Sequence, residues 1–474
     1  MSTDPDVSTA FSANRTAALP LHPPPTPPAP PHPEFQRSRH VSYWKRCLKT
    51  FLPAPYTPMD STRLMLSFFV LSPLDLLGEL VNVTTPAERA NYANWIYACQ
   101  LPSGGFRASP SMSLGARREE DKNGMWDPAH VPATYFALAS LCILKDDFKR
   151  VKRKECLRWL KKMQRDDGSF GQTLGADGAI EGGRDMRFGY CVMCSRWILR
   201  AGKGEKDLVG VEDIDIDGLV RCIRASETYD GGISDEPFHE AHAGFTYCAI
   251  AALSIAGRLP DSSNDTSTTT KQLLTAPSNV PLTLHWLASR QTTSVFEEEP
   301  LITKPWDFPS ANRTESELGL DHNEPDVPPA AGFNGRANKV SDTCYAFWVG
   351  ASMSLLEQCA GAGGGGRGLA DSQRARTYLV DKSQHLVGGF GKVAGDPPDV
   401  YHSSLGLAAL AMLGERNAAT GEGSGDGGEG LKTLDPGFCM SVEARGWAEG
   451  VDWDMEESEE SKADEYAYMR ISGG

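Results

Sequence analysis

Thr134-Tyr135-Phe136-Ala137-Leu138-Ala139 is one of six short stretches of small and aromatic apolar residues in this chain of 474 residues. A second stretch is Phe245-Thr246-Tyr247-Cys248-Ala249-Ile250. Segments that are apolar nearly all round are typical of helices buried on every side. The six candidate inner helices run near 63–80, 131–144, 188–200, 242–256, 342–356 and 402–413.

Glycine-rich turns accompany these stretches in a regular order. They are Gly104-Gly105-Phe106, Asp167-Gly168-Ser169-Phe170, Asp230-Gly231-Gly232, Gly332-Phe333-Asn334-Gly335 and Gly388-Gly389-Phe390-Gly391. Glycine readily adopts the positive φ that a tight reversal needs. A helix and a turn that recur at a regular period indicate an array of helical hairpins. We therefore expect an all-α fold, a closed α-α barrel of about six hairpins, because an open array would expose one face.

Composition shifts predict the domain organisation. We expect residues 1–38 to form a disordered Pro-rich extension and residues 416–474 to form a Gly-rich and acidic tail. Between them, residues 39–415 should form the barrel domain, with a low-complexity insertion near 258–330. The segment near 282–291 is expected to be an outer helix inside that insertion.

Charge and hydropathy exclude several classes of partner. The net charge of −15 argues against nucleic acid. The chain has no run of about eighteen uncharged apolar residues, so we expect no transmembrane segment. Its first residues lack the pattern of a signal peptide, and the eleven cysteines are scattered, mostly in apolar stretches. These features predict a cytoplasmic protein with reduced cysteines.

Two of the apolar stretches open with residues that bind metals. One begins with Asp342-Thr343-Cys344 and the next begins with Tyr401-His402. A carboxylate, a thiolate and an imidazole can hold Zn²⁺ in a tetrahedral site with one position left for a substrate. Taken singly, Asp342 is as well explained by a helix N-cap and Cys344 by a buried core cysteine. Together with His402 they favour zinc-assisted thiol chemistry inside a helical barrel.

Other motifs in the sequence do not indicate a metal site or a catalytic site. Cys191 and Cys194 have CxxC spacing, but a single pair inside an apolar helix indicates core packing. The acidic run from Asp213 to Asp217 lacks the DxDD order of terpene cyclases. A terpene-cyclising or carbohydrate-processing barrel would need carboxylates where this chain offers Asp, Cys and His. A catalytically silent binding scaffold would be expected to have lost one of these residues.

Three passages carry a resemblance to a known family. They are Glu240-Ala241-His242-Ala243-Gly244-Phe245-Thr246, the run from Gly335 to Gly350 that contains Arg336, Lys339, Asp342, Cys344 and Tyr345, and Asp185-Met186-Arg187-Phe188. Through them the chain from about His40 to Leu413 resembles the β subunits of protein prenyltransferases. The resemblance implies the toroid of helical hairpins that these proteins share with terpenoid cyclases.

The resemblance also implies site residues. Asp342, Cys344 and His402 match the family's Zn²⁺ ligands and catalytic centre, and the fourth ligand would be the cysteine thiolate of a substrate's C-terminal CaaX box. The family's diphosphate-binding residues correspond to His242, Arg336, Lys339 and Tyr345. Arg187 would lie on the substrate-facing wall, near the end of the peptide.

One position discriminates within the family. The resemblance implies a residue ten positions before the zinc histidine that differs between members of the family. Farnesyltransferases and Rab-type relatives have an aspartate there that helps to place Mg²⁺, whereas type I geranylgeranyltransferases have a lysine. This chain has Lys392, so Mg²⁺ should not be required. At Leu405, where relatives carry an aromatic residue, less bulk would deepen the apolar tunnel for a twenty-carbon chain, although this residue departs from the type I pattern. The resemblance is therefore closest to type I, and the alternatives are a farnesyltransferase or a Rab-type geranylgeranyltransferase β subunit.

The same resemblance implies the reaction and its partners. A zinc-activated thiolate would attack C1 of geranylgeranyl diphosphate, and the diphosphate would leave into a basic cluster. The acceptors would be CaaX-box proteins, usually ending in Leu, such as small GTPases of the Rho and Rac type. A separate prenyltransferase α subunit would complete a heterodimer.

Overall fold

A computed structural model describes residues 34–113, 127–175, 177–204, 208–260, 273–293, 330–359, 370–419 and 430–453, and the structural statements below concern these ranges. Most of the expected Pro-rich extension and most of the expected insertion near 258–330 lie outside the described residues. The last part of the expected tail, from residue 454 onward, also lies outside them.

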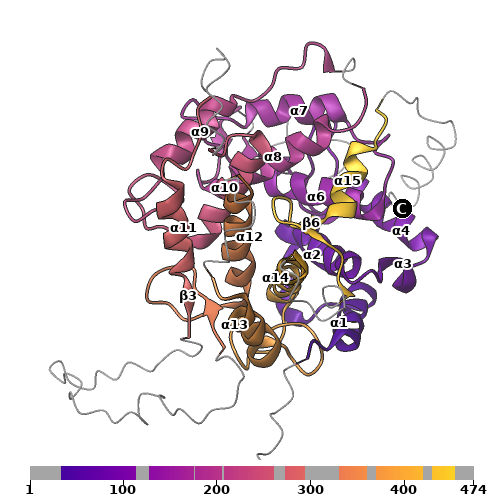
Figure 1. The fold of residues 1–474 in the computed structure, drawn as a ribbon. Coiled ribbons are helices and arrows are strands. Elements are labelled where there is room, and N and C mark those ends of the chain that lie inside the picture. Colours follow the sequence, from indigo (N-terminus) through magenta and orange to yellow (C-terminus); the bar gives the residue numbers. More distant parts are fainter. Residues whose placement is uncertain are drawn as a thin grey trace, which may run out of the picture. The chain divides into compact units, whose positions relative to one another are not determined.

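Six inner helices form a closed ring. They are α2 (Arg63–Leu76), α6 (Val131–Leu144), α8 (Met186–Arg200), α10 (Ala243–Ala256), α12 (Thr343–Cys359) and α14 (Val400–Ala419). Each inner helix packs against the next, and α14 packs against α2 (Figure 1). This contact between the last and the first inner helix closes the ring, so the expectation of a closed barrel is confirmed.

An outer helix precedes each inner helix and packs against it. The outer helices are α1 (Arg37–Lys49), α4 (Pro86–Tyr97), α7 (Arg153–Lys162), α9 (Ile216–Ala225), α11 (Val280–Ala288) and α13 (Ser372–Thr377), which continues as a π-helical turn over Tyr378–Ser383. The outer helix expected near 282–291 is α11. Six hairpins result, as the repeats predicted.

The remaining elements are short. Helix α3 covers Leu80–Val83, and 3₁₀ turns cover Ala54–Tyr56, Asp60–Thr62 and Pro110–Met112. Three antiparallel pairs join β1 (Thr173–Leu174) to β2 (Ile180–Glu181), β3 (Gln291–Thr292) to β4 (Gly332–Phe333), and β5 (Leu434–Asp435) to β6 (Met440–Ser441). None of the helices in the described ranges combines the length and apolarity that crossing a membrane requires.

The glycine-rich turns join outer helices to inner helices with one recurring geometry. Backbone bridges close the turn at Gln100 to Phe106, Gln164 to Phe170, Glu227 to Ile233 and Gln384 to Phe390. In the last of these turns, Gly388 has a φ of +85°, and a Cβ there would lie 2.2 Å from the carbonyl oxygen of Arg39. Only glycine fits this position, and its lack of a side chain lets the turn pack directly against α1.

The C-terminal part differs from the tail expected over 416–474. Residues 430–453 form the β5–β6 pair and α15 (Val442–Glu449), and α15 packs against α6 (Figure 1). Buried Asp75 of α2 receives hydrogen bonds from the side chains of Lys432 (2.7 Å) and Ser441. Buried Leu434 and Met440 add apolar contacts. The Gly-rich and acidic neighbours of this segment concealed its apolar residues at the level of composition.

Candidate metal centre

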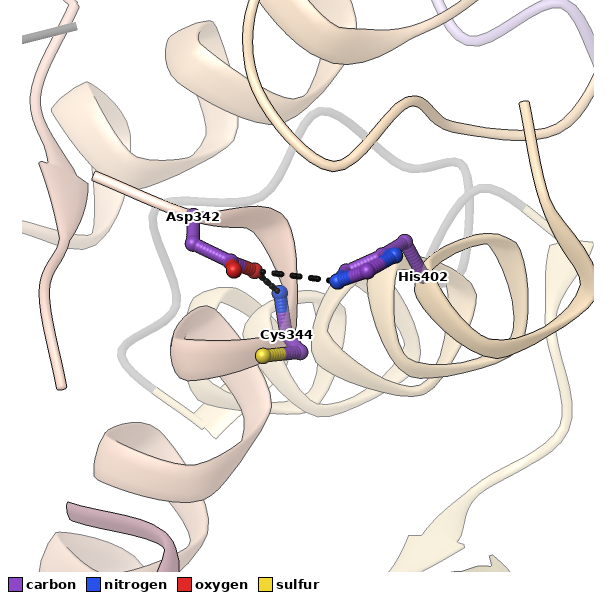
Figure 2. Close-up of side chains that lie close together, drawn as sticks. All are labelled: Asp342, Cys344 and His402. Carbon is purple, nitrogen blue, oxygen red and sulfur yellow. Dashed lines mark hydrogen bonds and ion pairs between the residues drawn. The ribbon is translucent and has the colours of Figure 1, made fainter. Parts of the chain in front are cut away.

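Two inner helices begin side by side and bring three metal-ligating side chains together. Asp342 directly precedes α12, Cys344 lies in its first turn, and His402 lies in the first turn of α14 (Figure 2). The Nε2 atom of His402 lies 3.4 Å from Oδ1 of Asp342. The ligand atoms of all three residues lie within 4.8 Å of one another. The residues that the sequence singled out from two repeats therefore form one cluster.

Helix caps orient two of these side chains. The Cys344 backbone N–H donates to Oδ1 of Asp342 at 2.9 Å, as expected for an N-terminal Asp. At the start of α14, Oδ1 of Asp399 accepts the backbone N–H of His402 at 2.9 Å. The other carboxylate oxygen, Oδ2, lies 2.6 Å from Nδ1 of His402. A proton on Nδ1 thus points at Asp399, and Nε2 is left facing Asp342.

Asp399 is a site residue whose role the sequence reasoning missed. Its spacing of three residues from a candidate metal-binding histidine was an available signal, because an N-cap aspartate reaches back over the first turn. A carboxylate behind a histidine fixes the tautomer and raises the basicity of the ligating nitrogen. Asp399 therefore positions His402 within the cluster.

Burial and pairing shift the acidities of all three residues. Burial raises the pKa of the Cys344 thiol well above its usual range, and the carboxylate of Asp342 raises it further. Burial alone would lower the pKa of His402, but hydrogen bonds to Asp342 and Asp399 raise it to about 9. Burial opposes ionisation of Asp342, yet its hydrogen bond to His402 holds its pKa below the ordinary value. The cluster without metal thus holds a thiol, an imidazolium and a carboxylate.

The cluster suits a zinc-like divalent cation. Bonds of roughly 2.0–2.3 Å from the metal to N, O and S ligands place tetrahedral neighbours roughly 3.5 Å apart. The separation of 3.4 Å between His402 and Asp342 meets this requirement, and Cys344 lies within the same compact group. Three protein ligands leave a fourth position open, which is the arrangement of catalytic rather than structural sites.

A second group surrounds the start of α10. His242 caps this helix, and its Nδ1 accepts the backbone N–H of Gly244 at 3.1 Å. Its Nε2 lies 3.0 Å from the hydroxyl of Tyr345, on α12. Because Nδ1 already accepts, the neutral ring carries its proton on Nε2 and donates it to the Tyr345 oxygen. The hydroxyl proton of Tyr345 is then available to another acceptor.

Positive charge lies next to this pair. Nη1 of Arg336 forms an ion pair with Oε2 of Glu240 at 3.3 Å, and both side chains are exposed. Burial lowers the pKa of His242, and the nearby Arg336 lowers it further. The Tyr345 hydroxyl, oriented by His242, and the guanidinium of Arg336 can therefore donate hydrogen bonds to an anion at this helix start.

The remaining predicted residues lie around these two groups. Lys339 is exposed in the loop before α12, and its carbonyl accepts a hydrogen bond from Asn334 at 2.9 Å. Lys392 is exposed, and its carbonyl accepts the backbone N–H of Thr343 at 2.8 Å, which places its backbone next to Asp342. Leu405 is completely buried in α14.

Arg187 lies at the start of α8. Its Nε and Nη2 donate to the two carboxylate oxygens of Asp185 at 2.8 and 2.9 Å. Its guanidinium lies 5.7 Å from the ring centroid of Phe245, three residues after His242. Arg187 therefore approaches the start of α10 through an aromatic contact, although its side chain is 64% exposed.

Comparisons with known proteins agree with the toroid fold. The family model of the prenyltransferase alpha-alpha toroid domain matches residues 35–440. The chain is similar to the geranylgeranyl transferase type-1 subunit beta of Arabidopsis thaliana, with 30% identity over 397 residues that cover 81% of this chain and 86% of the relative. It is also similar to the protein farnesyltransferase subunit beta of Schizosaccharomyces pombe, with 26% identity over 411 residues that cover 84% of this chain and 82% of the relative.

A solved structure is similar over nearly the whole chain. It is the Candida albicans protein geranylgeranyltransferase-I complexed with GGPP, with a TM-score of 0.65 and 26% sequence identity. The match covers 88% of this chain and 100% of the solved chain.

Proposed function

Because the chain belongs to the prenyltransferase alpha-alpha toroid family, we propose that it is the catalytic β subunit of a type I protein geranylgeranyltransferase. It transfers a geranylgeranyl group from geranylgeranyl diphosphate to the cysteine of a C-terminal CaaX box. The relatives named above support protein prenyl transfer, and two of those named are type I enzymes.

The observation that carries this proposal is the cluster of Asp342, Cys344 and His402 where α12 and α14 begin. Its donor set suits Zn²⁺ and leaves room for a substrate atom. Bound there, Zn²⁺ supplies the positive charge that lowers the pKa of a substrate cysteine thiol toward neutral pH. The chain's own contribution is to hold the three ligands in register through the Asp399 hydrogen bond and the two helix caps.

The residues around His242 stabilise the leaving diphosphate. As the bond between C1 and the diphosphate oxygen breaks, negative charge grows on that oxygen, and donors aimed at it lower the barrier. Tyr345 has a hydroxyl proton free to donate, because its oxygen accepts from His242. Arg336 adds a guanidinium once the diphosphate competes with Glu240 for it. Lys339 supplies a further cation from the same loop.

Lys392 supports a reaction that does not need Mg²⁺. Its backbone is hydrogen-bonded to the first residue of α12, beside the Asp342 cluster. An ammonium group held there can offset diphosphate charge that a metal ion would otherwise neutralise. The length of the isoprenoid, argued from Lys392 and Leu405, and the placing of the CaaX peptide near Arg187 belong to the same proposal.

We also propose the partners and the compartment that this activity requires. A prenyltransferase α subunit would form a heterodimer with this chain, and CaaX proteins such as Rho- and Rac-type small GTPases would be acceptors. Ten cysteines of the described residues form no disulfide, which supports the reducing cytoplasm as the location.

A transfer assay tests the proposal directly. The chain, co-expressed with an α subunit and loaded with zinc, is given geranylgeranyl or farnesyl diphosphate and a CaaX peptide ending in Leu, with and without Mg²⁺. We expect transfer of geranylgeranyl in preference to farnesyl, without Mg²⁺. A farnesyl preference or strict Mg²⁺ dependence would instead identify a farnesyl- or Rab-type enzyme.

Two variants assign the residues. Cys344→Ala should abolish transfer together with bound zinc, whereas Cys248→Ala, which alters a buried cysteine of α10, should keep both. An intact Cys344→Ala protein that retains its zinc would disprove the ligand assignment. Lys392→Asp should make transfer depend on Mg²⁺, and unchanged activity in a chelator would disprove that role.

A further inference from the structure

The outward face of α1 carries a concentration of positive charge that the proposed reaction does not use. Arg39, Lys45, Arg46 and Lys49 are all exposed, and the helix contains no acidic residue. At 100° per residue these four side chains fall within one third of the helix circumference. The chain as a whole has a net charge of −15, so this face runs against the overall charge.

Exposed apolar side chains flank this charged face. Leu386 is 78% exposed and Val387 is 49% exposed, in the turn that packs against α1. Nη2 of Arg46 donates to the carbonyl of Val387 at 2.8 Å, so the turn and the charged face are in contact. Phe51, two residues beyond the end of α1, is fully exposed.

These seven residues form what we call the basic–apolar patch. Its members are Arg39, Lys45, Arg46, Lys49, Phe51, Leu386 and Val387. Lys49 pairs with Glu88, and among the described residues the other three cations have no acidic partner. Cations interleaved with exposed apolar side chains are typical of surfaces that lie on anionic membranes.

The patch lies on the side of the barrel that carries the metal centre. The connection that follows Phe51 reaches Tyr56, whose hydroxyl accepts the backbone N–H of Val400 at 2.9 Å. Val400 is the first residue of α14, two positions before His402. The turn with Leu386 and Val387 runs on toward the same helix start. Both parts of the patch thus lead to the start of α14, the helix that carries one of the candidate metal ligands, His402.

We propose that the basic–apolar patch docks the enzyme on an anionic lipid surface. Its cations meet the phosphate and carboxylate groups of anionic lipids, and Phe51, Leu386 and Val387 enter the boundary with the acyl chains. The biological sense of this docking rests on the proposed function, because a twenty-carbon substrate and a lipidated product both partition into membranes. The docking itself depends only on charge and apolar exposure.

The expected loss of membrane binding in each variant follows from the residues of the patch. Each Lys or Arg near an anionic surface strengthens binding about fivefold, so reversing the charge of Lys45 should weaken binding about thirtyfold. Replacing Leu386 by Ser removes an inserting apolar side chain and should weaken binding about tenfold. Because the charges are exposed, added salt should reduce the effect of Lys45 and leave the effect of Leu386 nearly unchanged.

The test uses the complete heterodimer and vesicle flotation. The probes are vesicles of phosphatidylserine and phosphatidylcholine in equal amounts, compared with phosphatidylcholine alone. The variants are Lys45→Glu and Leu386→Ser. Their matched controls are Lys162→Glu, at an exposed lysine of α7, and Val209→Ser, at a side chain that is 84% exposed in the connection before α9. Transfer to a soluble CaaX peptide without vesicles is measured in parallel.

We expect the heterodimer to float with the anionic vesicles only, and both patch variants to lose binding while both controls keep it. Solution transfer should be unchanged in all four variants. Failure of the wild-type heterodimer to bind anionic vesicles would overturn the proposal, as would equal losses in patch and control variants. A patch protected by the α subunit from surface labelling would overturn it too. Vesicle binding without any prenyl transfer would contradict the proposed function but not the docking.

Discussion

Replacing Asp399 by Asn should weaken zinc binding without disturbing the fold. Asp399 has two roles, since Oδ1 caps α14 by accepting the His402 backbone N–H at 2.9 Å and Oδ2 faces the ring Nδ1 at 2.6 Å. Asn is as good an N-cap as Asp, so the cap survives. The charge behind the imidazole is lost, and loss of such a carboxylate typically costs 10–100-fold in metal affinity, or about 1.4–2.7 kcal/mol.

The size of this loss should depend on pH. Asp399 helps to raise the pKa of His402 to about 9, against the lowering effect of burial, so a proton competes with zinc for the imidazole at neutral pH. Asp399→Asn weakens the binding of both the proton and the zinc ion to the imidazole of His402. Near pH 7 the easier deprotonation offsets part of the lost affinity, whereas above pH 9 the whole loss appears. Zinc affinity should therefore fall more at high pH than at neutral pH.

Chelator competition at a series of pH values measures the effect, with thermal unfolding of the metal-free protein as a check on folding. Asp215→Asn is the matched control, because Asp215 caps the outer helix α9 by accepting the Gly218 N–H at 2.8 Å and lies outside the metal cluster. That variant should keep the wild-type affinity at every pH. The reasoning is refuted by an Asp399→Asn protein whose zinc affinity equals that of the wild type above pH 9, or whose loss is the same at all pH values.

Three further predictions concern protonation, the diphosphate group and stability. Zinc binding at pH 7–8 should release about two protons, because the raised pKa values of Cys344 and His402 keep both side chains protonated without metal. Calorimetry in buffers of different ionisation enthalpy counts the released protons, and no release would contradict both pKa shifts. Tyr345→Phe removes the hydroxyl that accepts a hydrogen bond from His242, and should lower kcat/KM for the isoprenyl diphosphate about tenfold with little change in KM for the peptide. An unchanged kcat/KM would exclude the hydroxyl from catalysis. Asp75→Asn should lower the free energy of unfolding by about 2 kcal/mol, because Lys432 loses its ion pair with the buried carboxylate and keeps only its pair with the exposed Glu443. Urea titration measures this loss, and unaltered stability would show that the C-terminal segment does not need the pair with Asp75.

Local patterns in the sequence predicted most of the barrel. Apolar residues around the whole circumference identified all six inner helices, because a helix buried on every side has no polar face to interrupt the run. The glycine-rich turns located the outer-to-inner connections, since a positive φ such as that of Gly388 leaves few alternatives. The residue types Asp342, Cys344 and His402 predicted a metal cluster, and the structure brings their ligand atoms within 4.8 Å. Their roles in catalysis stay predictions for the experiments above.

Other features were decided only by tertiary packing. The sequence suggested closure, but the contact of α14 with α2 establishes it, and this contact joins segments at opposite ends of the barrel domain. Residues 430–453 pack against α2 and α6, and there Asp75 meets Lys432 and Ser441, which lie far away in the sequence. The approach of His402 to Asp342 follows from the packing of α14 against α12. Periodicity and turn chemistry record only neighbours within a few residues, whereas such distant contacts form because burying apolar helices on all sides brings their ends together.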